Sequence, residues 1–246
     1  MPSVSIIIPT HNGRAQLAAC IASIRSFTKT PYEIIVVDNG SVDGTTDFCL
    51  AEQLMCISNP KNRGYPAACN QGMKAAGGDA ILLLNDDTVV SFRWLENMLD
   101  CLYSAPDVGV VGPMANVADG AQRSGVRYES LEEFHRLAET LNRPDPSRWA
   151  TVNQLVGFCM LIRREVLERV GLLDERFSPG HYEDDDYCRR VRAAGYRLML
   201  AGDTHIHHEG SLSFRRLGDE ALRRLLERNR RLFVRKWGSE PEGASI

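Results

Sequence analysis

The sequence predicts an α/β protein built on a mostly parallel sheet with helices on both faces. Before residue 80, a short apolar run is followed by a helical pattern three times, the alternation that a parallel sheet requires. Three apolar runs end in polar loops, at Thr10, Asp38 and Asp86. Because the carboxyl ends of parallel strands meet along one edge, we expect these loops to lie together where such folds bind ligands.

The composition is that of an ordinary globular protein, with 246 residues, 43% of them hydrophobic, and a net charge of −3. This balance excludes a basic nucleic-acid-binding protein and fits one domain with a full core. The start of the chain runs straight into a strand, so we expect no signal peptide, and no apolar stretch approaches the roughly 20 residues of a spanning helix. Seven cysteines without a CxxC pair predict free thiols in a reducing cytoplasm.

The first half of the chain is expected to alternate strands and helices. The central strand, Ala80–Leu84, is apolar throughout and should be buried on both faces. Around it we expect strands Val4–Ile8 (closed by Pro9), Glu33–Val37, Cys56–Ser58 and Val108–Met114, and helices Arg14–Ser26, Asp43 to about Leu54, Tyr65–Ala76 and Trp94–Tyr103.

The second half is expected to begin with a variable excursion over the sheet edge, Ala115–Arg148, with one helix at Leu131–Leu141. A turn at Gly202-Asp203 should separate the last strand from His205–His208. The remaining expected elements are strand Gln154–Arg163, helix Glu165–Val170, a helix opened by the acids of Tyr182–Asp186 and ending at Ala194, strand Tyr196–Ala201, a basic amphipathic helix Gly218–Trp237, and a tail over 239–246.

Two adjacent carboxylates, Asp86 and Asp87, follow directly after the central strand. Adjacent carboxylates repel, and partial burial raises the cost of their charge. A divalent cation removes that cost, and a histidine completes such a site well; three of the six histidines lie within His205–His208. The chain has neither GxGxxG after its first strand nor GxxxxGK[ST], which argues against dinucleotide dehydrogenases and P-loop enzymes.

Other polar residues suit a nucleotide and a proton acceptor. Thr10, Asn12 and Asp38 have side chains that can hydrogen-bond a base edge and a ribose, although a turn or helix cap is the simpler reading of Asn12. The four acids Glu183–Asp186 exceed what a helix N-terminus needs. One of them with a raised pKa would serve as a general base.

Seven motifs in order carry a resemblance over roughly Ser3 to Trp237: SIIIPTHN, VVDNGS, NRGYPAACNQG, LLLNDDT, GFCMLIRREVLERVGLLDERF, YEDDDYCRRVRAAGY and HHEGS. Together they resemble a family 2 glycosyltransferase of the bacterial branch that builds polysaccharides from UDP-sugars or dTDP-rhamnose. The resemblance implies a Rossmann-like GT-A fold in a single domain, 1–238. Within it we expect a nucleotide-binding half (1–114), an acceptor and catalytic half (115–210) and the C-terminal helix (211–238).

The resemblance also implies a role for each matching residue. Asp87 would bind a divalent metal, Mn²⁺ or Mg²⁺, with His207 or with His208, since a one-residue loop difference would exchange them. Asp184 would be the catalytic base, positioned by Glu183, although the run of acids to Asp186 leaves its place within 183–186 open. Gly157 and Phe158 would contact the acceptor. Donor contacts are expected from Thr10, His11, Asn12, Asp38, Asn39, Asn62, Arg63, Gly64, Asn70 and Asp86.

The mechanism implied is a single displacement that inverts the anomeric configuration. The acceptor would be a saccharide or a lipid-linked saccharide, and Asp38 would favour a UDP or dTDP donor by pairing with a pyrimidine N–H. The alternative is a non-catalytic sugar-nucleotide binding module in an assembly complex. A nucleotidyltransferase would need a basic, glycine-rich loop where THNGRAQ stands. Helix 218–237 is expected either to pack on the domain or to contact the inner face of a membrane through its arginines.

Overall fold

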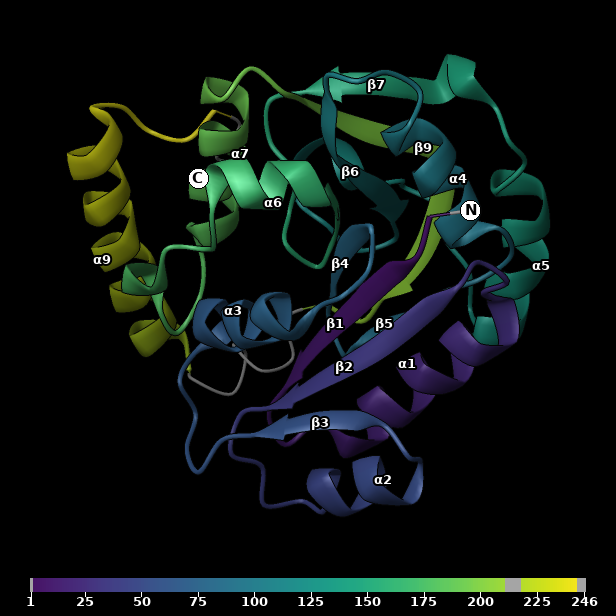
Figure 1. The fold of residues 1–246 in the computed structure, drawn as a ribbon, viewed down its shortest axis with the longest axis horizontal. Helices are drawn as coiled ribbons and strands as arrows, with labels where there is room; N and C mark the ends of the chain where they lie inside the picture. The colour runs from purple at the N-terminus through teal and green to yellow at the C-terminus, as the bar shows by residue number, and fades with distance from the viewer. Residues whose placement is uncertain (1, 211–217, 243–246) are drawn as a thin grey trace.

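The computed structural model describes residues 2–210 and 218–242, which form one sheet flanked by helices (Figure 1). The strand order is β3-β2-β1-β4-β8-β6-β9-β5, with β7 paired to β9. The strands are β1 (Val4–Thr10), β2 (Tyr32–Asp38), β3 (Met55–Ser58), β4 (Ala80–Leu84), β5 (Thr88–Val89), β6 (Val108–Ala115), β7 (Trp149–Val152), β8 (Cys159–Arg163) and β9 (Arg197–His208).

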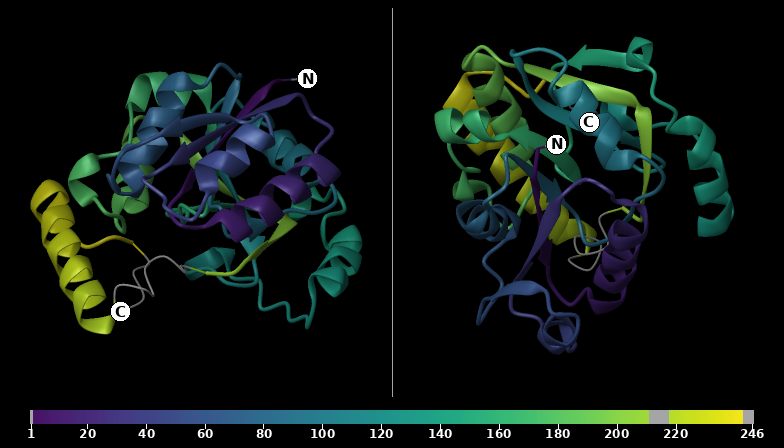
Figure 2. Two further views of the ribbon diagram at one scale, coloured as in Figure 1. Left: turned by 90° about the horizontal axis from the view of Figure 1, so that it is seen from below. Right: turned by 45° about the vertical axis from the view of Figure 1, so that its right-hand side comes forward.

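Helices cover both faces of this sheet. The α-helices are α1 (Arg14–Phe27), α2 (Thr45–Ala51), α3 (Tyr65–Ala75), α4 (Trp94–Leu102), α5 (Leu131–Leu141), α6 (Arg164–Val170), α7 (Glu183–Ala193) and α9 (Asp219–Trp237). Short 3₁₀ turns lie at Gly120–Gln122, Pro146–Arg148 and Glu175–Phe177. Figure 2 shows α5 and α9 at opposite ends of the molecule.

The predicted α/β class is confirmed, and the parallel arrangement holds from β3 through β4. Beyond β4 the sheet is mixed, because β8 runs antiparallel to both β4 and β6. The β1–β2 register pairs Thr10 with Asp38, which places their loops side by side. The first half of the sheet therefore delivers its polar strand ends to one edge, as the sequence predicts.

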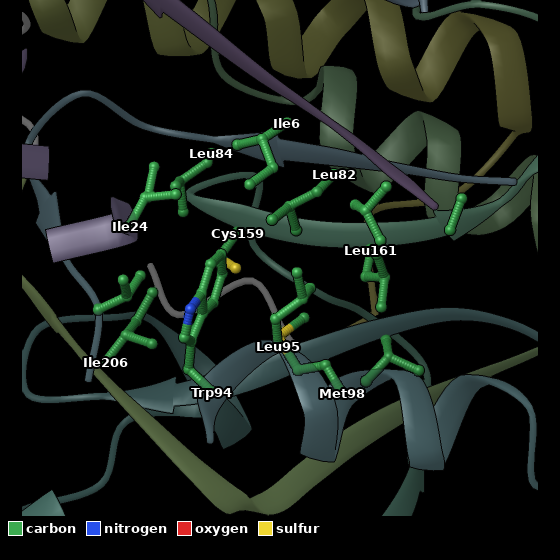
Figure 3. Packing of buried hydrophobic residues seen from close by; sticks show 14 of the residues in the cluster. Ile6, Ile24, Leu82, Leu84, Trp94, Leu95, Met98, Cys159, Leu161 and Ile206 are labelled. Carbon is green, nitrogen blue, oxygen red and sulfur yellow. The ribbon is translucent and has the colours of Figure 1, made fainter. Parts of the chain in front are cut away.

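Alternation along the central strands divides the core between two faces. Ile6, Leu82 and Leu84 pack with α1 and with α4, whose Trp94 lies in the middle of this cluster (Figure 3). Ile7 points the other way and joins the residues of α3, α6 and α7. Burial on both faces explains why these strands read as unbroken apolar runs.

Several predicted boundaries were wrong. Pro9 lies inside β1, paired with Val37, and the helix expected to reach Leu54 ends at Ala51. The strand expected from Gln154 begins at Cys159, and the short strands β5 and β7 were not predicted. Ahead of Cys159, backbone N–H groups donate to side chains instead of to a neighbouring strand: Leu155 to Cys188, Val156 to Gln122 and Gly157 to Asp184.

The predicted turn at Gly202-Asp203 is also wrong, because β9 runs without a break to His208. Its pairing with β6 passes from Pro113–Ala201 to Met114–His205, so the three residues 202–204 form a bulge. The carboxylate of Asp203, fully buried, accepts hydrogen bonds from the Asp145 backbone (2.9 Å) and the Trp149 indole (2.9 Å). The bulge is therefore a fixed part of the strand.

Three further expectations concern the ends and the thiols. Residues 211–217 of the expected C-terminal segment and 243–246 of the expected tail lie outside the described residues. All seven cysteines are free thiols. Among the described helices, none combines the length and apolar character needed to cross a membrane.

Candidate active site

Thr10 and Asp86 bring the ends of β1 and β4 into direct contact. The Thr10 hydroxyl donates to Asp86 Oδ2 at 2.6 Å, and Thr10 is only 4% exposed. Gly13 backs onto the same carboxylate: a Cβ at this position would lie 2.4 Å from Asp86 Oδ2. The THNG loop thus fits around Asp86 without room for another side chain.

Asp87 and His208 form a buried pair between the β4–β5 connection and the end of β9. Asp87 Oδ1 lies 3.3 Å from His208 Nε2, and neither atom has another hydrogen-bond partner in the described chain. His208 Nδ1 lies 2.8 Å from the Val117 carbonyl oxygen, which can only accept, so Nδ1 carries a proton. In the neutral ring the Nε2 lone pair therefore faces a carboxylate oxygen, and a proton or a cation is needed between them.

The pKa of His208 reflects this arrangement. Burial favours the neutral ring, but the hydrogen bond and negative charge of Asp87 outweigh it and raise the pKa above its ordinary value. A divalent cation would satisfy the same two atoms, since imidazole nitrogen and carboxylate oxygen both suit Mn²⁺. The described residues include no group of three or more His, Cys, Asp or Glu side chains that could hold a metal ion.

His207 and Phe158 lie differently from what the sequence suggested. His207 is on the opposite face of β9 from His208, with Nδ1 2.6 Å from the Tyr128 hydroxyl. Phe158, expected at the acceptor, is 2% exposed and stacks on the His208 ring at 4.8 Å between centroids. The aromatic face thus holds the imidazole in place, and the acceptor contact expected of Phe158 stays a prediction.

Asp184 is fixed by its own helix end and by the chain before β8. Its Oδ2 accepts from the Gly157 N–H at 2.9 Å, and its Oδ1 accepts from the Asp185 N–H at 3.0 Å. The Tyr65 hydroxyl donates to the Gly157 carbonyl at 2.6 Å and so holds the peptide that follows the one whose N–H meets Asp184. Gly157 therefore acts through its backbone.

The acids at the start of α7 have different surroundings. Burial raises the pKa of Asp184, and burial together with the charge of Asp184 raises the pKa of Glu183 well above its ordinary value. Glu183 is 6% exposed, and within the described residues its Oε2 has no hydrogen-bond partner. Burial and the charge of Asp184 raise the pKa of Asp185 to about 8, opposed by a hydrogen bond from Gln154.

Asp186 has a structural role instead. It is fully buried and accepts from Arg190 (2.9 Å), Lys236 (2.7 Å) and the Trp237 indole (2.9 Å), so it ties α9 to α7. Four acids in sequence thus divide into one structural anchor and three groups with raised pKa values.

Helix α9 also holds the loop that leads into α7. Asn229 is fully buried, and its Nδ2 lies within 2.9 Å of the carbonyl oxygens of Phe177, Gly180 and His181. Phe233, one helical turn on, is 1% exposed. The packing role expected for the apolar stripe of this helix is therefore present in its C-terminal half.

Two of the expected nucleobase contacts are occupied by the protein itself. Asp38 is 1% exposed; its oxygens accept from the Ser41 N–H (3.0 Å) and the Thr46 hydroxyl (2.7 Å). Asn12 Oδ1 accepts from the Val42 N–H at 2.8 Å, and Asn12 Nδ2 lies 3.3 Å from His11 Nε2. Both residues join the first two loops, and their contact with a base stays a prediction.

The asparagines expected along the ribose and diphosphate also hold loops together. Asn39 donates to Asn62 Oδ1 (3.0 Å) and to the Gly64 carbonyl (3.1 Å), and accepts from the Arg63 N–H (2.9 Å). Asn70, 2% exposed, exchanges hydrogen bonds with the Leu173 backbone, 2.9 Å each, so it fixes the loop after α6. Arg63 is exposed and keeps its guanidinium at the surface of this loop.

Sequence reasoning missed three residues that the structure brings into the site. Tyr65 is the aromatic residue of NRGY, and Gly13 is the glycine of THNG. In both motifs its position beside polar residues was an available signal. The signal for Asn229 was its position as a single short amide residue in a helix rich in arginine and leucine.

The chain matches the model of a protein family described as "Glycosyl transferase family 2" over residues 5–171. The O-antigen biosynthesis protein RfbC of Myxococcus xanthus is 32% identical over 85% of this chain and 18% of its own length. An N-acetylglucosaminyl-diphospho-decaprenol L-rhamnosyltransferase of Mycobacterium tuberculosis is 26% identical over 82% of this chain and 75% of its own.

Among solved structures, the mannosyltransferase PcManGT of Pyrobaculum calidifontis, in complex with GDP-Man and Mn²⁺, has a TM-score of 0.64. It is 23% identical, and the match covers 87% of this chain and 61% of that chain, a likeness that shows the fold. The chain spans 25%, 66% and 18% of the length of the first three curated relatives that it matches.

Proposed function

We propose that this chain, which belongs to glycosyltransferase family 2, is a metal-dependent, inverting enzyme that moves a sugar from a nucleotide-sugar donor to an acceptor hydroxyl. Its family and its GT-A fold, predicted from the sequence, are confirmed by the family match and the solved structure, and its transferase activity is proposed from that family. The metal, the stereochemistry, the donor and the acceptor are what we propose. The observation that carries the proposal is the buried Asp87–His208 pair.

Asp87 Oδ1 and His208 Nε2 are the atoms that we propose to hold the divalent metal, Mn²⁺ or Mg²⁺. They face each other at 3.3 Å without another partner in the described chain, and a cation would satisfy both. When bound, the metal would neutralise charge on the departing diphosphate. Asp86, held by Thr10 and Gly13, would hydrogen-bond the ribose or a metal-bound water. His207 is not proposed as a ligand, because it points away and contacts Tyr128.

Asp184 is proposed as the general base. Its raised pKa makes it a stronger proton acceptor than an ordinary aspartate, and the Gly157 N–H fixes one of its oxygens. Burial and the charge of Asp184 raise the pKa of neighbouring Glu183, which favours its uncharged form beside the base. Proton removal from the acceptor hydroxyl as it attacks gives inversion in one displacement, with oxocarbenium-like character at the sugar.

The donor nucleotide is proposed as UDP or dTDP, because Asp38 would pair with a pyrimidine N–H. Each Asp38 oxygen accepts one hydrogen bond from the protein and has a further lone pair. The acceptor is proposed as a saccharide, free or lipid-linked, in surface polysaccharide synthesis, in line with the printed names of the two relatives. We place the enzyme in the cytoplasm, with the arginines of α9 in weak contact with the inner face of the membrane.

A donor panel tests the proposal. UDP-, dTDP- and GDP-sugars are incubated with the protein and Mn²⁺, Mg²⁺ or excess chelator, and released nucleoside diphosphate is measured. We expect one donor class to be hydrolysed or transferred only with metal, and NMR of the product to show the opposite anomer. Donor binding without turnover in every condition, detected by thermal shift, would instead support the non-catalytic binding module. Full activity in chelator would overturn the metal assignment.

A further inference from the structure

An arginine-lined groove of about 860 Å³ runs along α9. Its arginines are Arg176, Arg223, Arg224, Arg228, Arg231 and Arg235, and Glu227 is the one acid among its lining residues. The volume is within the range of small-molecule sites, roughly 300–1,000 Å³. No role proposed so far for donor, metal or base uses this groove.

The groove is built on a fixed helix. Asn229 and Phe233 anchor one face of α9, and Lys236 and Trp237 bind Asp186. The groove residues recur on a different face, at intervals of three and four. These arginines are therefore presented by a backbone that tertiary contacts hold in place.

The positive charge of the groove exceeds what its neighbours neutralise. Arg176 pairs with Asp174 at 2.6 Å. Arg224 pairs with Glu220, and Arg231 pairs with Glu227 at 2.7 Å, both at exposed positions where ion pairs are weak and can be exchanged for a stronger anion. Within residues 2–210 and 218–242, the guanidinium groups of Arg223 and Arg235 have no hydrogen-bond or ion-pair partner. Guanidinium groups bind phosphate oxygens in a bidentate manner.

The groove adjoins the segment that carries the proposed base. Arg228 donates to the Ser178 carbonyl, and Ser178 lies against Gly64 of the expected donor loop. Asn229, the next residue, binds the His181 carbonyl, three residues before Asp184. A ligand held by these arginines would lie beside Arg176 and Ser178, in the segment that leads to Asp184.

We propose that this groove binds a diphosphate group carried by the acceptor, as in a lipid diphosphate-linked saccharide. The inference rests on the proposed function in that it assigns the acceptor of the same site. A diphosphate matches the surplus of guanidinium groups better than a neutral saccharide does, because each of its oxygens can accept from an arginine fork. The donor diphosphate is not the ligand meant, since its place is at Asp87 and His208.

Binding of geranyl diphosphate to the full chain, followed by calorimetry in excess chelator, tests the groove without the metal site. We expect saturable binding to the wild type, and a Kd raised about tenfold or more in R223Q/R235Q, because a charge-assisted contact is removed at each position. The matched control is R136Q, an exposed arginine of α5 that lies outside the groove and pairs with Glu132. Its Kd should stay within about twofold of the wild type.

Three further arms decide between sources of the anion. Inorganic diphosphate should compete with geranyl diphosphate, whereas UDP in chelator should compete no better than inorganic diphosphate. Equal affinity in the wild type and R223Q/R235Q would overturn the groove, and so would adsorption to anionic vesicles without saturable diphosphate binding. Donor hydrolysis by the wild type is measured alongside: if it is present while the groove fails, the proposed function stands, and if it is absent for every donor, the proposed function fails independently.

Discussion

Replacing Glu183 with glutamine should increase the stability of the protein relative to the wild type, and this difference should grow as the pH rises. The pKa of Glu183 in the folded chain lies well above its ordinary value of 4.5, because burial disfavours the charged form and Asp184 repels it. The folded state therefore holds this proton more tightly than the unfolded state. The stability contributed by Glu183 is full below pH 4.5 and is lost as the pH rises toward the raised pKa, at about 1.4 kcal/mol per pH unit. Glutamine keeps the shape and has no proton to lose.

A difference of one bound proton gives at most about 1.4 kcal/mol per pH unit, so between pH 5 and pH 7 the difference can grow by at most about 3 kcal/mol. Urea unfolding of both proteins at pH 5, 6 and 7, followed by circular dichroism, measures the difference directly. Glu139→Gln, at an exposed position of α5, reports the same chemical change outside the cluster. A difference that stays constant or shrinks as the pH rises would refute the reasoning about Glu183.

Three further outcomes are expected. Asp87→Ala and His208→Ala should each weaken Mn²⁺-dependent donor binding by at least about 100-fold in thermal-shift titrations, whereas His207→Ala should not; the reverse order for the histidines would exchange their roles. Asp184→Asn should lower the transfer rate by about 10²–10⁴ with donor affinity retained, and a larger loss in Asp185→Asn would move the base one residue on. Anionic but not neutral vesicles should sediment the protein at low salt, since each arginine near such a surface contributes about 1 kcal/mol, and recovery in the supernatant with both lipids would leave α9 only its packing role. Replacing Arg224, Arg228 and Arg231 together with glutamate should abolish this sedimentation.

The fold followed from the sequence where burial alone determines structure. The apolar run Ala80–Leu84 predicted β4 to the residue, because a strand buried on both faces has no tolerance for polar positions. The strand expected from Gln154 failed because its partners are side chains from distant segments, Gln122 and Cys188 among them. No local pattern signals such a contact.

The site was predictable in its charged residues and less so in its amides. Asp86 and Asp87 lie at the end of β4, as the NDD motif indicated, since adjacent carboxylates after a buried strand have few structural uses. The amide side chains of Asn39 and Asn70 can hydrogen-bond a ligand or the backbone of a loop equally well. The structure assigns them to loops because backbone groups of Arg63 and Leu173 lie within reach, which sequence spacing does not reveal.

The bulge at 202–204 determines which histidine can reach Asp87. Side chains of a strand alternate between faces, so an odd change in the number of bulge residues would turn His208 away and bring His207 into its place. Evolution could therefore lengthen or shorten this bulge only in steps of two without exchanging the two histidines. In an alignment of relatives, a histidine one column away from His208 beside a single-residue gap here would occupy the same place in space.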